Sequence, residues 1–284
     1  MSKIHFKNAI INYDIIFFQL LKTQNDLGIT PKKMISKSKI KLIASLSQKK
    51  FRDETGLFIA EGTKLVLDLS SSFYCSMLIA TAQWLSKNNT VKAEEIIEAT
   101  ESELKKISNQ KSPQGVLAVF KKPICTFDLQ ELSQSLSLAL DDIQDPGNLG
   151  TIIRIADWFG ITNVFCSEYT ADAFSPKTIQ ATMGAIGRVK VHSVNLQEFL
   201  SNCKNQIPIY GTLMDGENIY SKKLTSHGII VMGNEGNGIS AEIENLLTEK
   251  LLIPNYPIGQ ITSESLNVGV ATALVCAEFR RKRE

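Results

Sequence analysis

The chain has 284 residues, of which 43% are hydrophobic and 21% charged, with a formal net charge of +2. This length and composition predict a globular protein of two domains, and no apolar run approaches the roughly 18–20 residues that cross a bilayer. Five dispersed cysteines without a Cys-x-x-Cys pair argue against a disulfide framework and a zinc site, so we expect a cytoplasmic protein with reduced, mostly buried thiols and no metal.

The charges are distributed unevenly along the chain. Residues 1–125 contain 19 Lys+Arg and 11 Asp+Glu, whereas the remainder contains 12 and 18. The densest group of cations comprises Lys32, Lys33, Lys37, Lys39, Lys41, Lys49, Lys50 and Arg52. Such a density suits contact with the phosphates of a nucleic acid, although a solvated helix face gives the same pattern.

The N-terminal part predicts an extension followed by a small α/β domain. Residues 1–33 do not continue into a packed element, so we interpret them as an N-terminal extension without stable structure or as the result of a start codon assigned too early. Residues 34–122 show alternating helix and strand patterns. The predicted helices are a basic one at Lys39–Phe51, then Thr63–Leu69, a short helix around Gln83, and Glu101–Ser108; the strands are Leu57–Ala60, Met77–Ala80 and Gly115–Phe120.

Residues 123–132, which include Pro123, are the predicted linker to a second α/β domain at 133–284. Its apolar strands alternate with helices, as in a parallel sheet covered on both faces. The predicted strands are Leu136–Leu140, Asn163–Cys166, Arg188–Val191, Ile207–Leu213, Gly228–Met232 and Lys250–Ile253. The helices are Leu149–Phe159, Pro176–Met183, Leu196–Cys203 and Ala241–Leu247. A last helix is predicted to have Ser263 or Ser265 as its N-cap and an apolar stripe of Val270, Ala271, Leu274 and Val275.

The first loop whose side chains suit a functional site is Asp141–Gly150, which leads into a helix that carries Arg154. Arg154 is flanked in sequence by isoleucines, and a guanidinium in an apolar setting needs an anionic partner. A nearby aspartate is the simplest candidate for that partner. Asn148 and Arg154 need not touch, because six residues turn a helix through 600°.

The second loop, Gly233–Gly238, directly follows the apolar strand Gly228–Met232. Its Gly-x-x-Gly-x-Gly spacing differs from the dinucleotide-binding pattern, and no Gly-Lys-Ser/Thr follows, so a dehydrogenase or a nucleotide hydrolase is disfavoured. The glycines still permit close approach of the backbone to a ligand, and Glu235 adds a carboxylate at the strand end. A third loop, beginning at Ile253, connects the last strand to the last helix.

Taken together, these loops resemble a known family. Asp145–Arg154, Gly233–Gly238, and Ile253–Pro254 with Ser265–Val268 resemble, in order and spacing, the three motifs of the SpoU (TrmH-like) RNA 2'-O-ribose methyltransferases of the SPOUT class. The resemblance extends from about Leu136 to the end of the chain. More loosely, Phe58–Gly62 and Pro113–Ala118 resemble the small substrate-binding domain that many members carry.

The resemblance implies a fold, a cofactor and partners. The fold would be an α/β domain with a deep trefoil knot, a rare exception to the rule against threaded chains. The protein would methylate a ribose 2'-OH of ribosomal or transfer RNA, with S-adenosylmethionine as cofactor. It would be a homodimer through the knotted domain, with a site shared between the subunits.

The resemblance also implies which residues act. The cofactor would be bound, mainly by backbone groups, at Thr212, Leu213, Gly233, Gly238, Ile253 and Leu266. The catalytic residues would be Arg154, which acts on the hydroxyl together with an RNA phosphate, and Asn148, Glu235, Ser265 and Asn267, which hold Arg154 and the substrate. Arginine is a poor general base because of its high pKa, so an oriented phosphate is an alternative proton acceptor.

Two features depart from the family pattern. The segment Tyr256–Gln260 lengthens the usual path into the third motif, and Gln180 and Thr182 stand where arginine and serine are frequent. His192 and His227 are expected at the surface rather than in a site. Two alternatives remain: an inactive RNA-binding protein with the same fold, against which the intact motif residues weigh, and an unrelated α/β enzyme with a nucleotide cofactor. A small basic domain fits transfer RNA and ribosomal RNA alike, and the N-terminal extension of this domain favours ribosomal RNA slightly.

Overall fold

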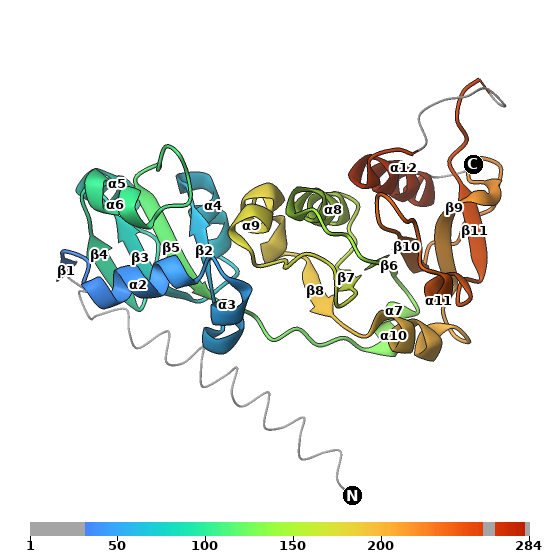
Figure 1. Cartoon of the computed structure of the whole chain (residues 1–284), viewed down its shortest axis with the longest axis horizontal. Helices are drawn as coiled ribbons and strands as arrows, with labels where there is room; N and C mark the ends of the chain where they lie inside the picture. Colours follow the sequence, from blue (N-terminus) through green and yellow to red (C-terminus); the bar gives the residue numbers. More distant parts are fainter. Residues whose placement is uncertain (1–31, 258–264, 282–284) are drawn as a thin grey trace, which may run out of the picture.

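The computed structural model describes residues 32–257 and 265–281, which form two α/β units, each built on one sheet (Figure 1). The strand order is β1-β4-β3-β5-β2 in the first sheet and β11-β9-β10-β6-β7-β8 in the second. The α/β class predicted for both parts is confirmed. Within the described ranges, no helix has the length and apolar character needed to span a bilayer.

The first sheet is mixed, with β5 antiparallel to both β2 and β3, and β4 parallel to β3. Ile43 of α2 and Leu104 of α6 pack on one face with Ile79 of β3, whereas Val66 and Leu69 of α4 pack on the other. The strands are β1 (Lys32–Lys33), β2 (Leu57–Glu61), β3 (Cys75–Ala80), β4 (Glu95–Glu98) and β5 (Val116–Lys121). The helices are α2 (Lys37–Ser45), α3 (Lys49–Thr55), α4 (Thr63–Ser70), α5 (Ala82–Lys87) and α6 (Glu101–Ile107).

The single basic helix predicted at Lys39–Phe51 is wrong, because two helices occupy this stretch. α2 ends at Ser45 and α3 begins at Lys49, with Gln48 between them in an extended conformation. The break lets the chain turn so that Arg52 Nη1 donates to the Leu46 carbonyl at 2.7 Å. Arg52 is therefore a buried structural residue and not one of the exposed cations of the basic group.

The second sheet is parallel throughout, as predicted. Its strands are β6 (Leu136–Leu140), β7 (Asn163–Cys166), β8 (Lys190–Ser193), β9 (Ile209–Asn218), β10 (Gly228–Met232) and β11 (Glu249–Leu252). The helices are α7 (Leu129–Leu132), α8 (Pro146–Trp158), α9 (Pro176–Thr182), the 3-10 helix η2 (Ala185–Gly187), α10 (Leu196–Cys203), α11 (Ala241–Glu244) and α12 (Val268–Arg280). β8 starts two residues later than predicted, and α11 ends three residues earlier.

Alternate residues of the central strands β6 and β10 face two different cores. Leu138 and Ile230 pack with α8 and α12, whereas Ala139 and Val231 pack with α10 and α11. Every residue of both strands is buried, which is the expected result of covering a parallel sheet on both faces. This burial explains why these strands appear in the sequence as continuous apolar runs.

The predicted linker, residues 123–132, is anchored rather than free. It contains the short helix α7, and the Phe127 ring packs edge-on against Phe165 at 5.1 Å between centroids and against His192 at 5.3 Å. His192 is only 5% exposed, and its Nε2 pairs with Asn163 Oδ1 at 3.0 Å. The expectation that His192 lies at the surface is therefore wrong; His227 is half-buried.

The two units pack directly on each other. The Phe58 ring of β2 lies 5.0 Å from the Phe174 ring, which precedes α9, and one apolar cluster continues from the first unit into the second. β1 adds Lys32 and Lys33 to the first sheet, opposite Ile97 and Glu98. The rest of the predicted N-terminal extension lies outside the described residues, and the domain boundaries stay predictions.

The last helix begins later than predicted. Asn267 is the N-cap of α12, and its Oδ1 accepts from Gly269 N at 3.0 Å and Val270 N at 3.3 Å. Ser265 is thus not the cap, and Ser263 lies outside the described residues. The trefoil knot also stays a prediction, because the chain between β11 and α12 passes through residues 258–264, which the structure does not describe.

The predicted apolar stripe of α12 is split between two environments. Val275 is fully buried against the sheet and α8, while Val270 and Leu274 are 52% and 39% exposed. The helix buries instead a row that includes Thr272 and Phe279. Sequence periodicity locates an apolar face but does not say whether this chain covers all of it.

Candidate functional site

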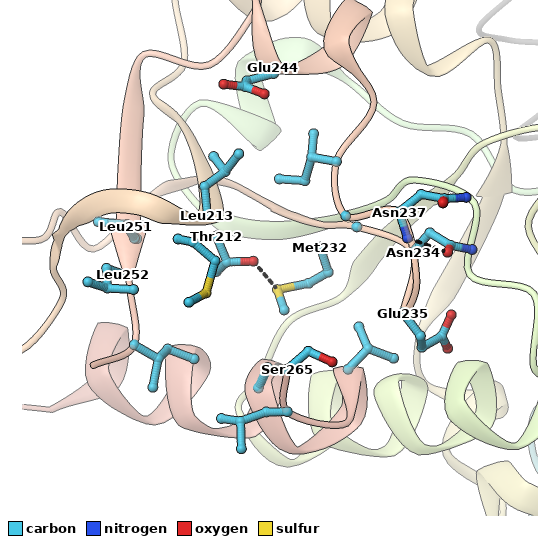
Figure 2. Close-up of a pocket in the computed structure, with 18 of the residues that line it drawn as sticks. Thr212, Leu213, Met232, Asn234, Glu235, Asn237, Glu244, Leu251, Leu252 and Ser265 are labelled. Carbon is cyan, nitrogen blue, oxygen red and sulfur yellow. Dashed lines mark hydrogen bonds between the residues drawn. The ribbon is translucent and has the colours of Figure 1, made fainter. Parts of the chain in front are cut away.

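A cavity of about 640 Å³ lies beyond the carboxyl ends of β9, β10 and β11 (Figure 2). In parallel α/β sheets, ligands bind at this edge. All six residues predicted to bind the cofactor line the cavity, from four segments of chain: Thr212, Leu213, Gly233, Gly238, Ile253 and Leu266. The start of α12 closes one side, with Val268 and Ala271 in the lining.

A bulge in β9 supplies one wall of the cavity. Gly211 pairs with Lys250 of β11, but the next pair is Glu217 with Leu251, so residues 212–216 leave the ladder. A bulge releases backbone N–H and C=O groups from strand pairing. Thr212 and Leu213 both line the cavity, so these groups lie beside the ligand space; β9 extends beyond its predicted end at Leu213 because Glu217 and Asn218 pair again with β11.

The glycine-rich loop supplies a second wall and is held by Asn234. Asn234 Oδ1 accepts from Gly236 N at 2.9 Å and Asn237 N at 3.0 Å, and its Nδ2 donates to the Asp142 carbonyl at 2.7 Å. These bonds tie the loop after β10 to the loop after β6. Sequence reasoning did not single out Asn234, although an asparagine at the head of a glycine turn is a signal for this kind of local bonding.

Three predicted catalytic residues form one chain of hydrogen bonds beside the cavity. Asn267 Nδ2 donates to Asn148 Oδ1 at 3.0 Å, and Asn148 Nδ2 donates to Glu235 Oε1 at 2.7 Å. Each residue comes from a different motif, so the fold joins all three motifs at one point. Ser265 lies next to this chain in sequence and lines the cavity, as Glu235 does.

Asp145 fixes the first turn of α8 and hence the backbone of Asn148. Its Oδ1 accepts from Asn148 N at 2.9 Å, and its Oδ2 accepts from Lys177 Nζ at 2.9 Å. The Lys177 hydrogen bond, followed by the Asn148 backbone, lowers the pKa of Asp145 below its ordinary value. Asp145 was not among the predicted site residues, although an N-cap aspartate followed by proline at the first helical position is a recognisable signal in the sequence.

Arg154 is exposed, so its predicted apolar setting is wrong. Ile152 and Ile153 point into the core, but Arg154 and Trp158, one turn apart on α8, face outward. Arg154 makes no ion pair or hydrogen bond with any described residue, including the other predicted catalytic residues, and Asp157 pairs instead with Arg188 at 2.7 Å. The donors of Arg154 are therefore available to a partner from outside the described chain.

Exposed apolar side chains lie on α8, the helix that carries Arg154, and on α12 beside it. α8 and α12 run side by side in the same direction, since Asn148 meets Asn267 at their starts and Arg280 Nε donates to the Phe159 carbonyl at 2.9 Å near their ends. Their outer faces carry Trp158, Val270 and Leu274, which are 86%, 52% and 39% exposed. We call these three residues the α8/α12 face.

The chemistry of the cavity suits a ligand with an apolar ring and a positive charge. Leu213, Leu266 and Ala271 provide apolar contacts, the strand ends provide backbone groups, and Glu235 provides a carboxylate, whereas Glu244 of the lining is paired with Lys250. No group of three or more metal-binding side chains occurs within residues 32–257 and 265–281.

Comparison with known proteins relates both parts of the chain to RNA-modifying enzymes. The family model described as the SpoU rRNA Methylase family matches residues 135–277, and one described as the MRM3-like substrate binding domain matches residues 37–118. The chain is 30% identical over 246 residues to the 23S rRNA (guanosine(2553)-2'-O)-methyltransferase RlmP of Bacillus subtilis, covering 85% of this chain and 96% of the relative.

Solved structures agree with this relationship. An RNA methyltransferase structure described as of the TrmH family, from Porphyromonas gingivalis, superposes with a TM-score of 0.80 at 40% identity, covering 87% of this chain and 98% of that one. An AdoMet-bound rRNA methyltransferase from Sinorhizobium meliloti gives a TM-score of 0.76 at 29% identity, covering 88% and 97%.

Proposed function

The chain belongs to the SpoU rRNA methylase family, and on that premise we propose that it transfers a methyl group to a ribose 2'-OH of a ribosomal RNA. It is an RNA 2'-O-methyltransferase with S-adenosylmethionine as its cofactor. The observation that carries the assignment of the site is the Asn267–Asn148–Glu235 chain, because it joins three motifs at the rim of a cavity lined by every predicted cofactor residue.

The cavity fits S-adenosylmethionine in size and in chemistry. Its volume falls within the range of small-molecule sites, about 300–1,000 Å³. The backbone of residues 212–216, freed from the ladder, and Gly233 would hold the polar parts of the cofactor, while Leu213 and Leu266 would pack on its adenine. When bound, the cofactor supplies a methyl group made reactive by the sulfonium charge, which the Glu235 carboxylate would complement.

The catalytic residues act mainly by positioning. A ribose hydroxyl is a very weak acid, so methylation requires the oxygen to be held in line with the methyl group and its proton to be accepted. Asn148 and Asn267 fix the Glu235 carboxylate at the rim of the cavity, where the ribose would bind. The Arg154 guanidinium would orient an RNA phosphate that accepts the proton.

We propose ribosomal RNA rather than transfer RNA because of the first domain and the relatives. The first domain matches the MRM3-like substrate binding domain, and the relative from Bacillus subtilis is named for 23S rRNA. Lys37, Lys41 and Lys49 are exposed on α2 and α3, where they would contact phosphates. Action on ribosomal RNA would place the protein in the cytoplasm.

We further propose a homodimer through the α8/α12 face. This face leaves Trp158, Val270 and Leu274 exposed on adjacent parallel helices, and Arg154 lies on the same side of α8. A second subunit covering it would bury the apolar side chains and bring Arg154 near the partner, consistent with a site shared between subunits. Leu274→Asp should therefore give a monomer in sedimentation velocity, whereas Leu129→Asp, which changes a leucine of matching 38% exposure on α7, should not.

The methylation proposal is tested by labelled methyl transfer from S-adenosylmethionine to total RNA from cells that lack the protein. Wild type should label one ribose 2'-O position of a ribosomal RNA, and Arg154→Ala should lose at least about 100-fold in rate while binding the cofactor normally by calorimetry. Label in transfer RNA would overturn the ribosomal assignment. Absence of cofactor binding by the wild type would overturn the assignment of the cavity.

A further inference from the structure

We propose that the cleft between the two domains binds an unpaired nucleotide of the substrate RNA, adjacent to the nucleotide that is methylated. The inference rests on the proposed function and extends it to a second contact site. The cleft has a volume of about 630 Å³ and is lined by both domains, with Ile59 and Gln110 from the first and Gly147, Lys177, Ile179 and Gln180 from the second. It is separate from the cofactor cavity, with which it shares no lining residue.

The lining combines an apolar surface with an unused amide donor. Pro176 and Ala181, which are both partly exposed, supply apolar contact, and Gln110 Nε2 donates across the domain junction to Gln180 Oε1 at 3.1 Å. Gln180 is exposed, and its own Nε2 has no hydrogen-bond partner among the described residues. Proteins read single-stranded RNA by packing a splayed base on a flat surface and bonding its edge, which this combination allows.

Glu61, a buried carboxylate in the lining of the cleft, already has hydrogen-bond partners within the protein. The Glu61 carboxylate accepts from Ser108 Oγ and, through Oε1, from Asn109 N at 2.9 Å and Asn109 Nδ2 at 3.2 Å. These bonds fix the loop that carries Gln110 and leave the carboxylate turned toward that loop. The exposed Lys49, Lys111 and Lys177 lie in or within two residues of the lining, so the rim attracts phosphates.

The cleft reaches the catalytic residues through the first turn of α8. Gly147 is part of the lining and precedes Asn148, and Lys177 of the cleft pairs with Asp145, which caps the same turn. An RNA strand with its target ribose beside Asn148 therefore continues directly into the cleft. We therefore expect the cleft to hold a nucleotide next to the target in the RNA strand rather than the target nucleotide itself.

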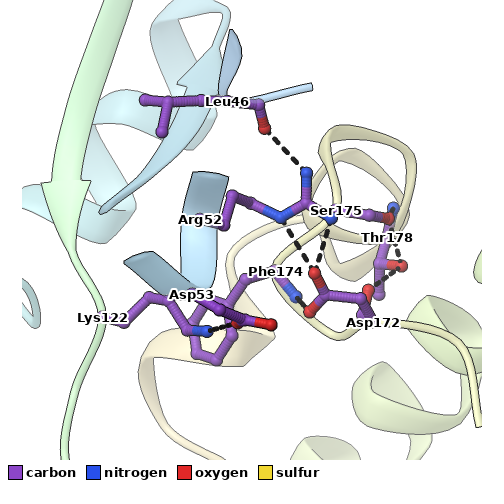
Figure 3. A network of polar contacts seen from close by, with 8 residues as sticks. All are labelled: Leu46, Arg52, Asp53, Lys122, Asp172, Phe174, Ser175 and Thr178. Carbon is purple, nitrogen blue, oxygen red and sulfur yellow. Dashed lines mark hydrogen bonds and ion pairs between the residues drawn. The ribbon is translucent and has the colours of Figure 1, made fainter. Parts of the chain in front are cut away.

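A polar network keeps the two walls of the cleft in a fixed position (Figure 3). Arg52 of the first domain donates through Nε at 2.8 Å and Nη2 at 2.6 Å to Asp172 Oδ2 of the second. Asp172 in turn holds the start of α9, because its carbonyl accepts from Thr178 Oγ1 at 2.8 Å. A cleft formed before RNA arrives avoids the cost of ordering its walls on binding.

The test uses Gln180→Glu, with Gln83→Glu as its matched control. Gln180→Glu retains an oxygen acceptor for Gln110, so the contact between the domains persists, but it replaces the free amide donor with a carboxylate. Gln83 is an exposed glutamine of α5 that is not in the cleft lining, and its substitution changes the net charge equally. The probes are a short random-sequence single-stranded RNA for binding and total RNA for methyl transfer, together with a 4-thiouridine version of the short RNA for crosslinking.

Gln180→Glu should weaken binding of the single-stranded RNA about tenfold, the effect of losing one base contact, and should raise the Michaelis constant for total RNA without changing kcat or cofactor affinity. Gln83→Glu should change none of these. Crosslinks of the wild type should map to residues 109–110 or 176–181. Equal weakening in both variants, or crosslinks only outside the cleft, would overturn the proposal. A wild type that binds RNA in this way but transfers no methyl group would refute the proposed function and leave the cleft as an RNA site.

Discussion

At the scale of single residues, the site depends on Asn148 using both ends of its amide. The Nδ2 donates to Glu235 and the Oδ1 accepts from Asn267, so no other side chain of similar size can replace it. Asn148 does not itself line the cofactor cavity. Its role is therefore separable from cofactor binding by measurement.

Asn148→Ala should lower kcat for methyl transfer by about 10- to 100-fold while changing the affinity for S-adenosylmethionine less than about twofold. Because Asn148 acts through Glu235, the effects of Asn148→Ala and Glu235→Gln should not add. A double-mutant cycle should give a coupling of about 0.5–3 kcal/mol. Additive losses would show that the hydrogen bond between them does not matter for catalysis.

His192 should make stability depend on pH. Burial, and then the charge of Lys190, lower the pKa of His192 below the ordinary histidine value of 6.5. Between the folded pKa and about 6.5, the unfolded chain binds more protons than the folded one, so stability increases with pH in this range. The stabilising contribution of neutral His192 is complete above about pH 6.5, and it is lost as the pH falls toward the pKa of His192 in the folded protein.

The free energy of unfolding from urea titrations should therefore decrease between pH 7 and pH 5 by up to about 1.4 kcal/mol per pH unit for this one group. His192→Phe, which can stack on Phe165 as His192 does at 4.8 Å, should show a smaller decrease over the same range. An identical pH dependence in the variant would mean that carboxylates alone account for it.

At the scale of the elements, the glycines of the loop Gly233–Gly238 differ in what they tolerate: Gly233 is closely packed, Gly238 has a φ of +72°, and Gly236 has room for a side chain. A Cβ on Gly233 would lie 2.3 Å from the backbone carbon of Gly238, whereas a Cβ on Gly236 would lie 3.5 Å from Asn234 Oδ1. Gly233→Ala should open the loop and reduce cofactor affinity at least about tenfold, since the loop forms a wall of the cavity. Gly236→Ala should bind the cofactor normally in calorimetry, and equal affinities in the two variants would contradict this account.

The strands of the second sheet were predictable because burial on both faces leaves a continuous apolar run, as in Leu136–Leu140 and Gly228–Met232. The four-residue strand β4 was not, because its two central isoleucines lie between Glu95 and Glu98. The ends of helices were also difficult to predict from the sequence. Both Ser265 and Asn267 are good N-caps in sequence, and only tertiary packing selects Asn267.

The site was largely predictable as a set of residues but not as a geometry. The motifs identified Asn148, Glu235 and Asn267, and the structure joins them. The sequence interpretation placed Arg154 in an apolar setting because its neighbours Ile152 and Ile153 are apolar, but these two side chains lie on the buried face of α8 and Arg154 on the exposed one. The sequence also could not reveal the β9 bulge, which depends on pairing with a strand that follows much later in the chain.

At the scale of the whole molecule, the junction between the domains is a packed interface with a buried ion pair. The side chains of Arg52 and Asp172 are only 3% and 13% exposed, and Lys122 lies over the Phe174 ring at 5.4 Å beside them. The sequence predicted a linker at residues 123–132 but no interface between the domains, because the residues that form the interface are far apart in the chain. With one apolar cluster running through both domains, we expect a single unfolding transition.

Asp172→Asn should lower the free energy of unfolding by about 3–5 kcal/mol, because it leaves the Arg52 charge buried without its partner. Asp157→Asn is the control, since its partner Arg188 is 53% exposed and the loss should be under about 1 kcal/mol. Both values come from denaturant titrations followed by fluorescence and circular dichroism. Two separate transitions in the wild type, or equal losses in the two variants, would contradict a rigid junction.

The cavity and the catalytic chain draw on different parts of the sequence. Every lining residue of the cavity falls between Thr212 and Ala271, whereas the catalytic chain reaches back to Asn148, and Arg154 lies on the same early helix. In evolutionary terms, a duplicated gene that lost Asn148 and Arg154 would still encode the complete pocket. A descendant of this protein can therefore exchange catalysis for ligand sensing without rebuilding its fold.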